Sequence, residues 1–368
     1  MVTSTLPNFE PFLGRSLATA PSSNLAAPAS GKATAVQAWF DELAAASGPA
    51  QDGSLQAARE SARANQSRAK ARNTRAAYRS AVRKWCAWCD KRGLPALPGA
   101  SCDVAAFISD ESEGRLAATT IRLRVAAIRY LHRAAGLPSP TATAEVSETV
   151  AGIVNSRAAP RKKRAATLTV LRELLVPIPD DLRGHRDRAL LLVGFAGALR
   201  RSELAAIRLA DLQRTDRGYE LTLPRSKGSQ AKPVLVPLPY GKTELCPVHA
   251  LMRWIAAAGV TDGPVFRRIW LPPSPEADGS HPTSAVGAEA LTPRSIARII
   301  QSRAAGAGFI PGDFGGHSLK RGALTTGMQR GAHPAQLKRL GRHKGFGVLG
   351  EYLEHGDLFD GHPLTEAL

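Results

Sequence analysis

Apolar residues recur every three or four positions between about residues 67 and 155, which predicts helices throughout this segment. The first predicted helix has its apolar stripe at Tyr78, Val82, Trp85 and Trp88. Gly93 and Pro95 end this helix, because glycine frees the backbone and proline has no N–H to continue the ladder. Three further helices are predicted at 104–109, from about 119 to 136, and at 146–154.

The first 66 residues lack a sustained period and are rich in Ala, Ser, Pro and Gly, so residues 1–66 are predicted to be a flexible segment. The exception is a short amphipathic helix near 35–47, with Val36, Trp39, Phe40 and Leu43 on one face. Asp41 and Glu42 lie on the opposite face. Because its polar face is acidic, we expect this helix to dock on its own or a neighbouring subunit rather than on a polyanion such as a nucleic acid, although an isolated helix of little consequence has the same pattern.

The apolar period changes beyond residue 167. Short alternating runs at 219–223 and 233–238 flank the sequence RSKGSQAK, which predicts a β-hairpin with a basic tip. Residues 272–290 are predicted to form a long surface loop. The helices predicted in this part are 169–176, 186–196, 248–258, 293–305, 317–330 and 334–340. The expected fold class is therefore mainly α with a small antiparallel β element.

Positive charge is concentrated in the predicted helical domain. The chain has 49 Lys and Arg against 31 Asp and Glu, a formal net charge of +18. Residues 67–165 hold 19 of the basic and 7 of the acidic residues, a net charge of +12, which indicates double-stranded DNA as the partner. The polar faces of the first and third predicted helices carry Arg75, Arg79, Arg83, Lys84, Arg122, Arg129 and Arg133. We expect these residues to lie along phosphates, although a solvated helix face also carries such charges.

A basic segment separates the two predicted domains. Residues 157–166 contain proline and no apolar period, which predicts a linker between a helical domain at 67–156 and an α+β domain at 167–368. The charges of Arg161, Lys162, Lys163 and Arg164 suit a strap across a DNA backbone.

Several other classes of protein are not indicated. There is no apolar run of about 18 residues and no export signal, so we expect no membrane contact and a cytoplasmic, nucleoid-associated protein. Cys86 and Cys89 have metal-ligand spacing but lack a second pair or a nearby histidine. Because the sequence also lacks an ATP-binding loop and a close cluster of acidic residues, we expect chemistry without a metal or another cofactor.

Cleavage of DNA without a metal needs a side-chain nucleophile and cations around the phosphate. The second half of the chain supplies such a set in this order: ALRRSEL at 198–204, Lys227 at the hairpin tip, HSLKR at 317–321, GRH at 341–343, and Tyr352. With these ordered elements the chain resembles the tyrosine recombinases of the phage integrase family over roughly residues 70–355. The resemblance implies that 67–156 is a core-binding domain and that 167–368 is the catalytic domain.

The resemblance implies a role for each matched residue. Arg200 would grip two phosphate oxygens with its planar guanidinium, and Glu203 would orient neighbouring groups. Lys227 would protonate the leaving 5′ oxygen. His317 and His343 would hydrogen-bond the scissile phosphate or assist proton transfer.

Tyr352 would be the nucleophile, and its phenol has to lose a proton during attack because its ordinary pKa is about 10. The function implied by the resemblance is that of a site-specific recombinase or integrase, which forms a 3′-phosphotyrosine bond and acts as a tetramer on two duplexes. Two alternatives stay open: a non-catalytic DNA-binding protein on a degenerate recombinase scaffold, and an enzyme like a type IB topoisomerase.

One position departs from the family pattern, which has an arginine three residues after the first histidine. Here that position is Lys320, and Arg321 follows it. A lysine supplies charge without the two-pronged geometry of a guanidinium. Both residues flank His317 on a helix, so Lys320, favoured by the register, or Arg321, favoured by phosphate geometry, could take this role.

Overall fold

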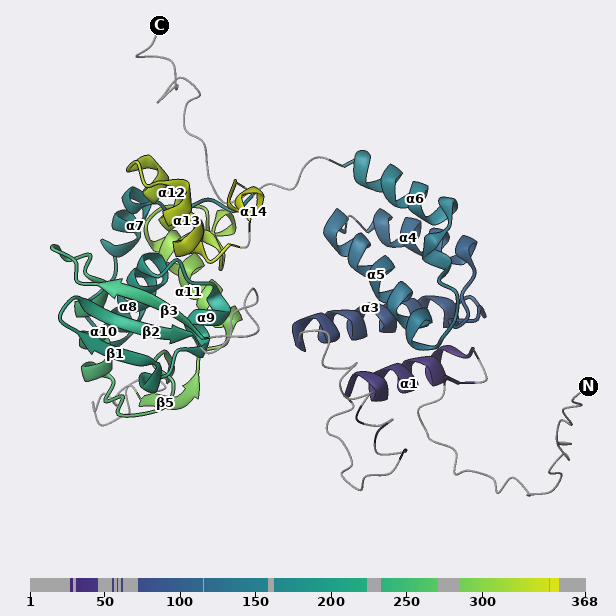
Figure 1. The fold of residues 1–368 in the computed structure, drawn as a ribbon, viewed down its shortest axis with the longest axis horizontal. Helices are drawn as coiled ribbons and strands as arrows, with labels where there is room; N and C mark the ends of the chain where they lie inside the picture. The colour runs from purple at the N-terminus through teal and green to yellow at the C-terminus, as the bar shows by residue number, and fades with distance from the viewer. Residues whose placement is uncertain are drawn as a thin grey trace, which may run out of the picture. The chain divides into compact units, whose positions relative to one another are not determined.

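The computed structural model divides the chain into two compact units, Met1–Pro160 (unit 1) and Arg161–Leu368 (unit 2) (Figure 1). The expected fold class is confirmed, because the described residues form mainly helices with two small antiparallel sheets. The structure describes residues 27–28, 31–45, 55, 58, 61, 72–114, 116–157, 162–223, 233–270, 285–343 and 345–350.

Unit 1 is helical. Its described elements are α1 (Ala33–Ala45), α3 (Arg72–Asp90), α4 (Ser101–Glu113), α5 (Ala118–Ala134), the 3-10 helix η1 (Pro140–Ala142) and α6 (Ala144–Asn155). Helices α3 and α5 are each followed by a glycine with positive φ, Gly93 at +66° and Gly136 at +72°, a backbone conformation that costs little only without a Cβ.

A buried histidine stabilises the core of unit 1. His132 on α5 is fully buried; its Nδ1 donates to the carbonyl oxygen of Ile128 and its Nε2 accepts from the N–H of Gly99, both at 2.9 Å. Burial lowers the pKa of His132, so the ring is neutral and both nitrogens are satisfied. Nearby, Trp85 is fully buried and donates to the carbonyl oxygen of Ala96 at 2.9 Å.

Helix α1 belongs to this core. Val36, Trp39 and Phe40 are buried, and the ring of Phe40 meets that of Tyr130 edge-on with centroids 6.1 Å apart. On the polar side, Asp41 pairs with Arg79 of α3 at 2.9 Å. The amphipathic face of α1 is therefore covered within its own unit.

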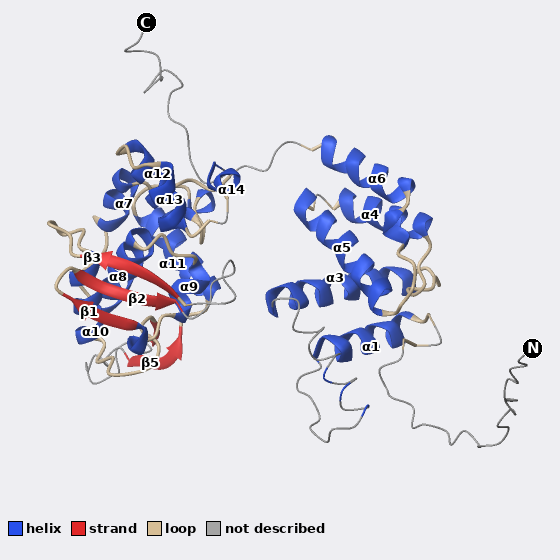
Figure 2. Ribbon diagram, viewed as in Figure 1, coloured by secondary structure: helices blue, strands red, loops and turns tan. Residues whose placement is uncertain are grey.

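The described residues of unit 2 form eight α-helices, two 3-10 helices and two sheets. The α-helices are α7 (Leu168–Leu175), α8 (Leu182–Ala196), α9 (Arg201–Ala206), α10 (Pro247–Ala257), α11 (Pro293–Gly306), α12 (Ser318–Gln329), α13 (Pro334–Gly341) and α14 (Phe346–Gly350), and the 3-10 helices are η2 (Leu209–Asp211) and η3 (Pro311–Asp313). One sheet has the order β1 (Leu212–Thr215), β2 (Gly218–Leu223), β3 (Val234–Pro239), and the other pairs β4 (Arg267–Trp270) with β5 (Ala285–Ala290) (Figure 2).

The hairpin predicted from the sequence is the β2–β3 pair, in which Leu221 faces Val236. The prediction of a loop over 272–290 is wrong for its last six residues, which form β5. Its sequence, AVGAEA, has only one of the β-branched or aromatic residues that mark a strand, Val286, and the strand is stabilised by pairing with β4.

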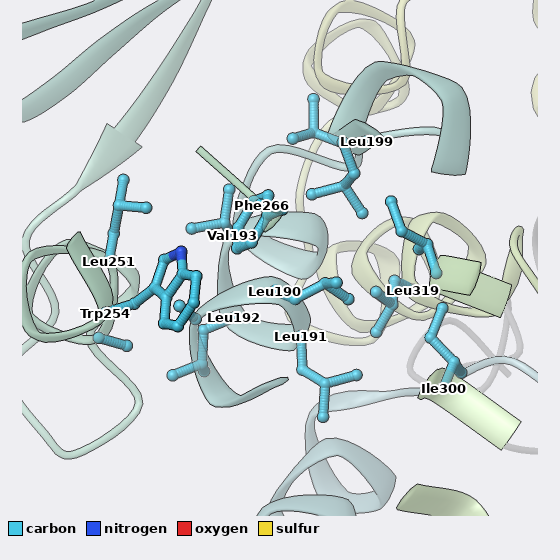
Figure 3. Packing of buried hydrophobic residues seen from close by; sticks show 14 of the residues in the cluster. Leu190, Leu191, Leu192, Val193, Leu199, Leu251, Trp254, Phe266, Ile300 and Leu319 are labelled. Carbon is cyan, nitrogen blue, oxygen red and sulfur yellow. The ribbon is translucent and has the colours of Figure 1, made fainter. Parts of the chain in front are cut away.

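Helix α8 is the centre of unit 2. Leu190, Leu191, Leu192 and Val193 are consecutive and buried, so this part of the helix is apolar all round, as expected of a segment enclosed by other elements. Figure 3 shows these side chains with Leu199, Trp254 and Leu319 in one cluster (Figure 3).

A glycine brings α8 close to the two helices that carry the candidate site. A Cβ on Gly194 would lie 2.7 Å from Cδ1 of Leu319 on α12 and 2.9 Å from Cδ1 of Leu204 on α9. These distances are too short for non-bonded carbons, so a larger residue would push both leucine side chains aside. Leu204 follows Glu203 and Leu319 precedes Lys320, so this close packing lies directly beside both polar residues in the chain.

The packing of α1 predicts a stability effect. Phe40→Ala removes a ring that is 1% exposed, and we expect the free energy of unfolding of unit 1 to fall by about 3 kcal/mol. Urea denaturation of the full chain measures this change. Glu42→Ala, on the exposed face of the same helix, is the control and should stay within about 0.5 kcal/mol of wild type. Equal midpoints for the two variants would contradict the core role of α1.

Candidate active site

The turn between α8 and α9 holds the first part of the site. Arg200 is the N-cap residue of α9, and the carboxylate of Glu203 accepts its backbone N–H at 2.8 Å. The same carboxylate accepts from Nη1 of Arg200 at 2.6 Å. Glu203 thereby closes the first turn of α9 and holds the guanidinium of Arg200 in place.

The other side of Glu203 is occupied by Arg342, which follows α13. Nη2 of Arg342 donates to Oε2 of Glu203 at 2.7 Å, so the buried carboxylate lies between two guanidinium groups. Burial raises the pKa of Glu203, but the charge of Arg342, the N–H of Arg200 and the charge of Arg200 outweigh it and hold this pKa below its usual range. Glu203 is therefore ionised at neutral pH.

Lys320 on α12 lies in the same cluster. It is fully buried, and its Nζ donates to the carbonyl oxygen of Gly341 at 2.5 Å. Burial, followed by the charges of Arg200 and Arg342, lowers its pKa from 10.5 to about 7, against the opposing effect of Glu203. Lys320 is thus held in a strongly positive environment in which it readily gives up a proton.

Burial and cations of this cluster lower the pKa values of both expected histidines, His317 and His343. Burial first, and then Lys320, Arg200 and Arg342, lower the pKa of His343 to about 4. Burial, Arg201, Lys320 and Arg200 also lower the pKa of His317, the N-cap residue of α12. Both rings are therefore neutral at neutral pH, the state in which an imidazole both donates and accepts a hydrogen bond.

Arg321 contacts the segment that leads into α7. It is buried, and its Nη1 donates to the backbone carbonyl oxygen of Lys163. Of the two alternatives for the second arginine position, Lys320 lies in the electrostatic field of Arg200, and Arg321 binds the backbone at Lys163.

Residues 162–166, within the segment predicted as a linker, form a strap across α12 and η3. The N–H of Ala166 donates to Ser318 O at 2.9 Å, and the N–H of Arg164 donates to Asp313 O at 2.7 Å. A Cβ on Gly322 would lie 1.8 Å from the carbonyl oxygen of Ala166, so only glycine lets the strap pass this close to α12. The strap is part of the packing of unit 2, while the side chains of Lys162, Lys163 and Arg164 stay exposed.

The basic residues expected to contact DNA from unit 1 differ in exposure. Arg79 pairs with Asp41, and Nε of Arg129 donates to Oγ1 of Thr141 at 2.9 Å. Arg75 is half-buried. The exposed members of the set are Arg83, Lys84, Arg122, Arg129 and Arg133.

Three of the expected residues, Arg161, Lys227 and Tyr352, lie outside the described residues. Sequence reasoning missed Arg342, whose only signal is its place between Gly341 and His343.

Across the described chain no group of three His, Cys, Asp or Glu residues is arranged to hold a metal ion. Cys86 and Cys89 are buried, and burial raises the pKa of each to about 12, which makes them core residues rather than reactive thiols.

The arrangement is suited to an anion. Arg200, Arg342 and Lys320 surround a single buried carboxylate, and two neutral histidines lie in the same field. Preorganised cations and hydrogen-bond donors of this kind stabilise the charge that develops in phosphoryl transfer.

Comparisons with known proteins agree with this chemistry. Residues 65–136 match the model of the phage integrase N-terminal SAM-like domain. The chain is 31% identical over 305 residues to an integrase/recombinase XerD homolog of Selenomonas ruminantium, covering 81% of this chain and 86% of the relative. The chain belongs to the tyrosine recombinase family. The expected enzyme class, a tyrosine-type site-specific recombinase, is confirmed by this relationship.

Solved tyrosine recombinases share the fold. The XerH recombinase in a post-cleavage complex with its palindromic difH substrate is 13% identical, with 93% of this chain and 98% of that chain covered and a TM-score of 0.59. A lambda integrase tetramer bound to a Holliday junction is 15% identical, with 80% and 76% covered and a TM-score of 0.54. No helix among the described residues of this recombinase is both long and apolar enough to cross a membrane.

Lys320 makes the stability of unit 2 depend on pH. Because its pKa is about 7 in the folded protein and 10.5 ordinarily, the unfolded chain binds more protons between these values, and the free energy of unfolding rises with pH there. Between about pH 7 and pH 9 we expect wild type to gain about 2 kcal/mol relative to Lys320→Met, which has no group to titrate. Urea denaturation at both pH values tests this, and parallel profiles would contradict it.

Proposed function

We propose that this recombinase cleaves and rejoins duplex DNA at specific sites through a 3′-phosphotyrosine intermediate formed by Tyr352. The observation that carries the proposal is the cationic cluster of Arg200 and Lys320. The buried carboxylate of Glu203 pairs with Arg200 and Arg342 in this cluster, and two neutral histidines lie in the same electrostatic field. Such a cluster supplies the electrostatic part of phosphoryl transfer without a metal or nucleotide.

In the proposed first step the phenol of Tyr352 gives its proton to one of the two neutral histidines, His317 or His343, as its oxygen attacks the scissile phosphorus. A bond from tyrosine to the 3′ phosphate forms as the bond to the 5′ oxygen breaks, and the leaving oxygen takes a proton from Lys227. Arg200 and Lys320 neutralise the non-bridging oxygens, and His317 and His343 donate hydrogen bonds to them or assist proton transfer. An approaching phosphate raises the pKa of Lys320 again and holds it in its cationic form.

In the second step the 5′ hydroxyl of a partner duplex attacks the phosphotyrosine and releases Tyr352. Each step exchanges one phosphodiester bond for another, so no cofactor is required. The lambda integrase tetramer on a Holliday junction supports, by analogy, a tetramer of this chain on two duplexes. A protein acting within a single duplex would instead behave as a type IB topoisomerase.

Removal of the Tyr352 hydroxyl should abolish covalent chemistry. Tyr352→Phe should bind the recombination site with an affinity within about threefold of wild type, since the cationic contacts with the phosphates are unchanged, and should form no adduct on a nicked suicide substrate. Denaturing gel electrophoresis detects the adduct. An adduct in the variant would remove Tyr352 from the role, and no adduct in wild type would favour the non-catalytic alternative. Strand exchange between two labelled duplexes separates recombination from topoisomerase activity.

The two candidates for the second arginine position should differ in single-turnover cleavage. Lys320→Ala should lower the cleavage rate by about 10²-fold, the scale of losing one preorganised donor, and Lys320→Arg should keep activity. Arg321→Ala removes the contact with the strap at Lys163 and should affect thermal stability more than the rate of cleavage. The reverse ranking of the two alanine variants would assign the role to Arg321.

Neutralisation of phosphates should dominate affinity, given the net charge of +12 on residues 67–165. We expect affinity to fall by about 10³-fold between about 50 and 200 mM salt. Replacing the exposed Arg83 and Lys84 by alanine should reduce the slope of log affinity against log salt by about 2. Arg79→Ala, which removes an arginine already paired with Asp41, is the matched control and should leave the slope unchanged. Fluorescence anisotropy measures all three proteins.

A further inference from the structure

We infer that Arg342 is a positioning residue of this recombinase, whose guanidinium holds the turn carrying Arg200 against the turn carrying His343 without itself contacting DNA. The inference rests on the proposed function, because it assigns to Arg342 the alignment of groups that would act on the phosphate.

Both terminal nitrogens of Arg342 are engaged by contacts within unit 2. Nη1 donates to the carbonyl oxygens of Gly197 at 2.9 Å and Leu340 at 3.0 Å, and Nη2 donates to the carbonyl oxygen of Ala198 at 2.8 Å and to Oε2 of Glu203 at 2.7 Å. Two terminal nitrogens carry four hydrogens, so these contacts engage each of them. The terminal nitrogens of Arg342 therefore have no hydrogen left to offer a phosphate, and the remaining donor, Nε, is buried.

The two turns joined by Arg342 are both strained. Ala198 has φ of +44° and Arg342 has φ of +53°, a left-handed conformation that is unfavourable for a residue with a Cβ. Ala198 lies two residues before Arg200, and Arg342 directly precedes His343. The hydrogen bonds to Gly197 and Ala198 stabilise the first turn and simultaneously tie it to the second.

Arg342 also controls how Arg200 meets Glu203. In the structure Arg200 Nη1 binds Oε1, while Oε2 is taken by Arg342 and by the backbone N–H of Arg200. Without Arg342, Oε2 becomes available, and the planar fork of Arg200 can bind both carboxylate oxygens. Arg200 would then be drawn away from the phosphate, so loss of Arg342 should slow chemistry more than it weakens DNA binding.

Arg342→Met removes the hydrogen bonds at similar side-chain volume, and Arg342→Lys keeps the charge. Single-turnover cleavage at saturating protein should fall by about 10²-fold in Arg342→Met, the scale of a misplaced reacting group, and by less in Arg342→Lys. The dissociation constant for DNA should stay within about threefold, as expected for a residue outside the DNA contacts. The matched control is Arg339→Ala, which removes an exposed arginine from α13 and should cleave at the wild-type rate. Unchanged cleavage in both Arg342 variants would overturn the inference.

A pH profile separates positioning from simple loss of folded protein. Lys320 is faced by Arg200, Arg342, Glu203 and His343. Loss of the Arg342 cation should raise the pKa of Lys320 and move the alkaline limb of the cleavage profile to higher pH in Arg342→Met, whereas Arg342→Lys should keep the wild-type limb. A lowered rate with an unmoved limb in Arg342→Met would mean that Arg342 is only structural.

Histidine NMR without DNA tests the same geometry independently of activity. The charge of Arg342 helps to lower the pKa of His343 to about 4, so this pKa should rise in Arg342→Met and not in Arg339→Ala. If wild type formed no covalent adduct, the proposed function would fail while this titration still decided the placement of Arg342. An unchanged pKa of His343 would overturn the inference.

Discussion

The candidate site depends on one buried carboxylate, Glu203, held between the guanidinium groups of Arg200 and Arg342. An unpaired carboxylate would be costly at a position where only 8% of the residue is exposed. Two arginines from different parts of unit 2 satisfy it, so the ends of α8 and α13 have to lie together whenever the unit is folded. The reactive groups acquire their geometry from this requirement.

The same pairing leaves the site electrically unbalanced. One carboxylate faces several cations, and the low pKa values of Lys320 and His343 report the excess of positive potential. A phosphate entering the cluster would relieve the repulsion among these cations. The family pattern has an arginine at the position of Lys320. The ammonium of Lys320 is small and stays buried with the carbonyl oxygen of Gly341 as an acceptor. A guanidinium at this position has five N–H donors and would need more acceptors.

The sequence predicted most of this architecture where a periodic signal was available. The long helices and the β2–β3 hairpin have regular apolar spacing, and the structure contains them. Helix α9 has six residues, and strand β5 has Val286 as its one apolar residue larger than alanine, so neither has a period to detect. In the site, the ordered motifs singled out Arg200, Glu203, His317, Lys320 and His343, and the structure brings these residues together, whereas their catalytic roles remain proposals.

Arg342 could not be found from the sequence, because its role comes from four acceptors that meet only in the folded unit. Charge spacing alone also did not distinguish Arg79, which binds Asp41, from the exposed Arg83.

The strap at 162–166 bears on how such an enzyme can be rebuilt. A chimera in which unit 1 is replaced by another DNA-binding module has to be joined to unit 2 at a chosen residue. Because α7 is the first helix of unit 2, the position just before α7 would be an obvious choice. A fusion made there would discard the backbone that Arg321 and Ser318 bind and would expose the glycine surface of α12 beneath it. A chimera that keeps the native sequence from Lys162 onward preserves the support of the helix that carries Lys320.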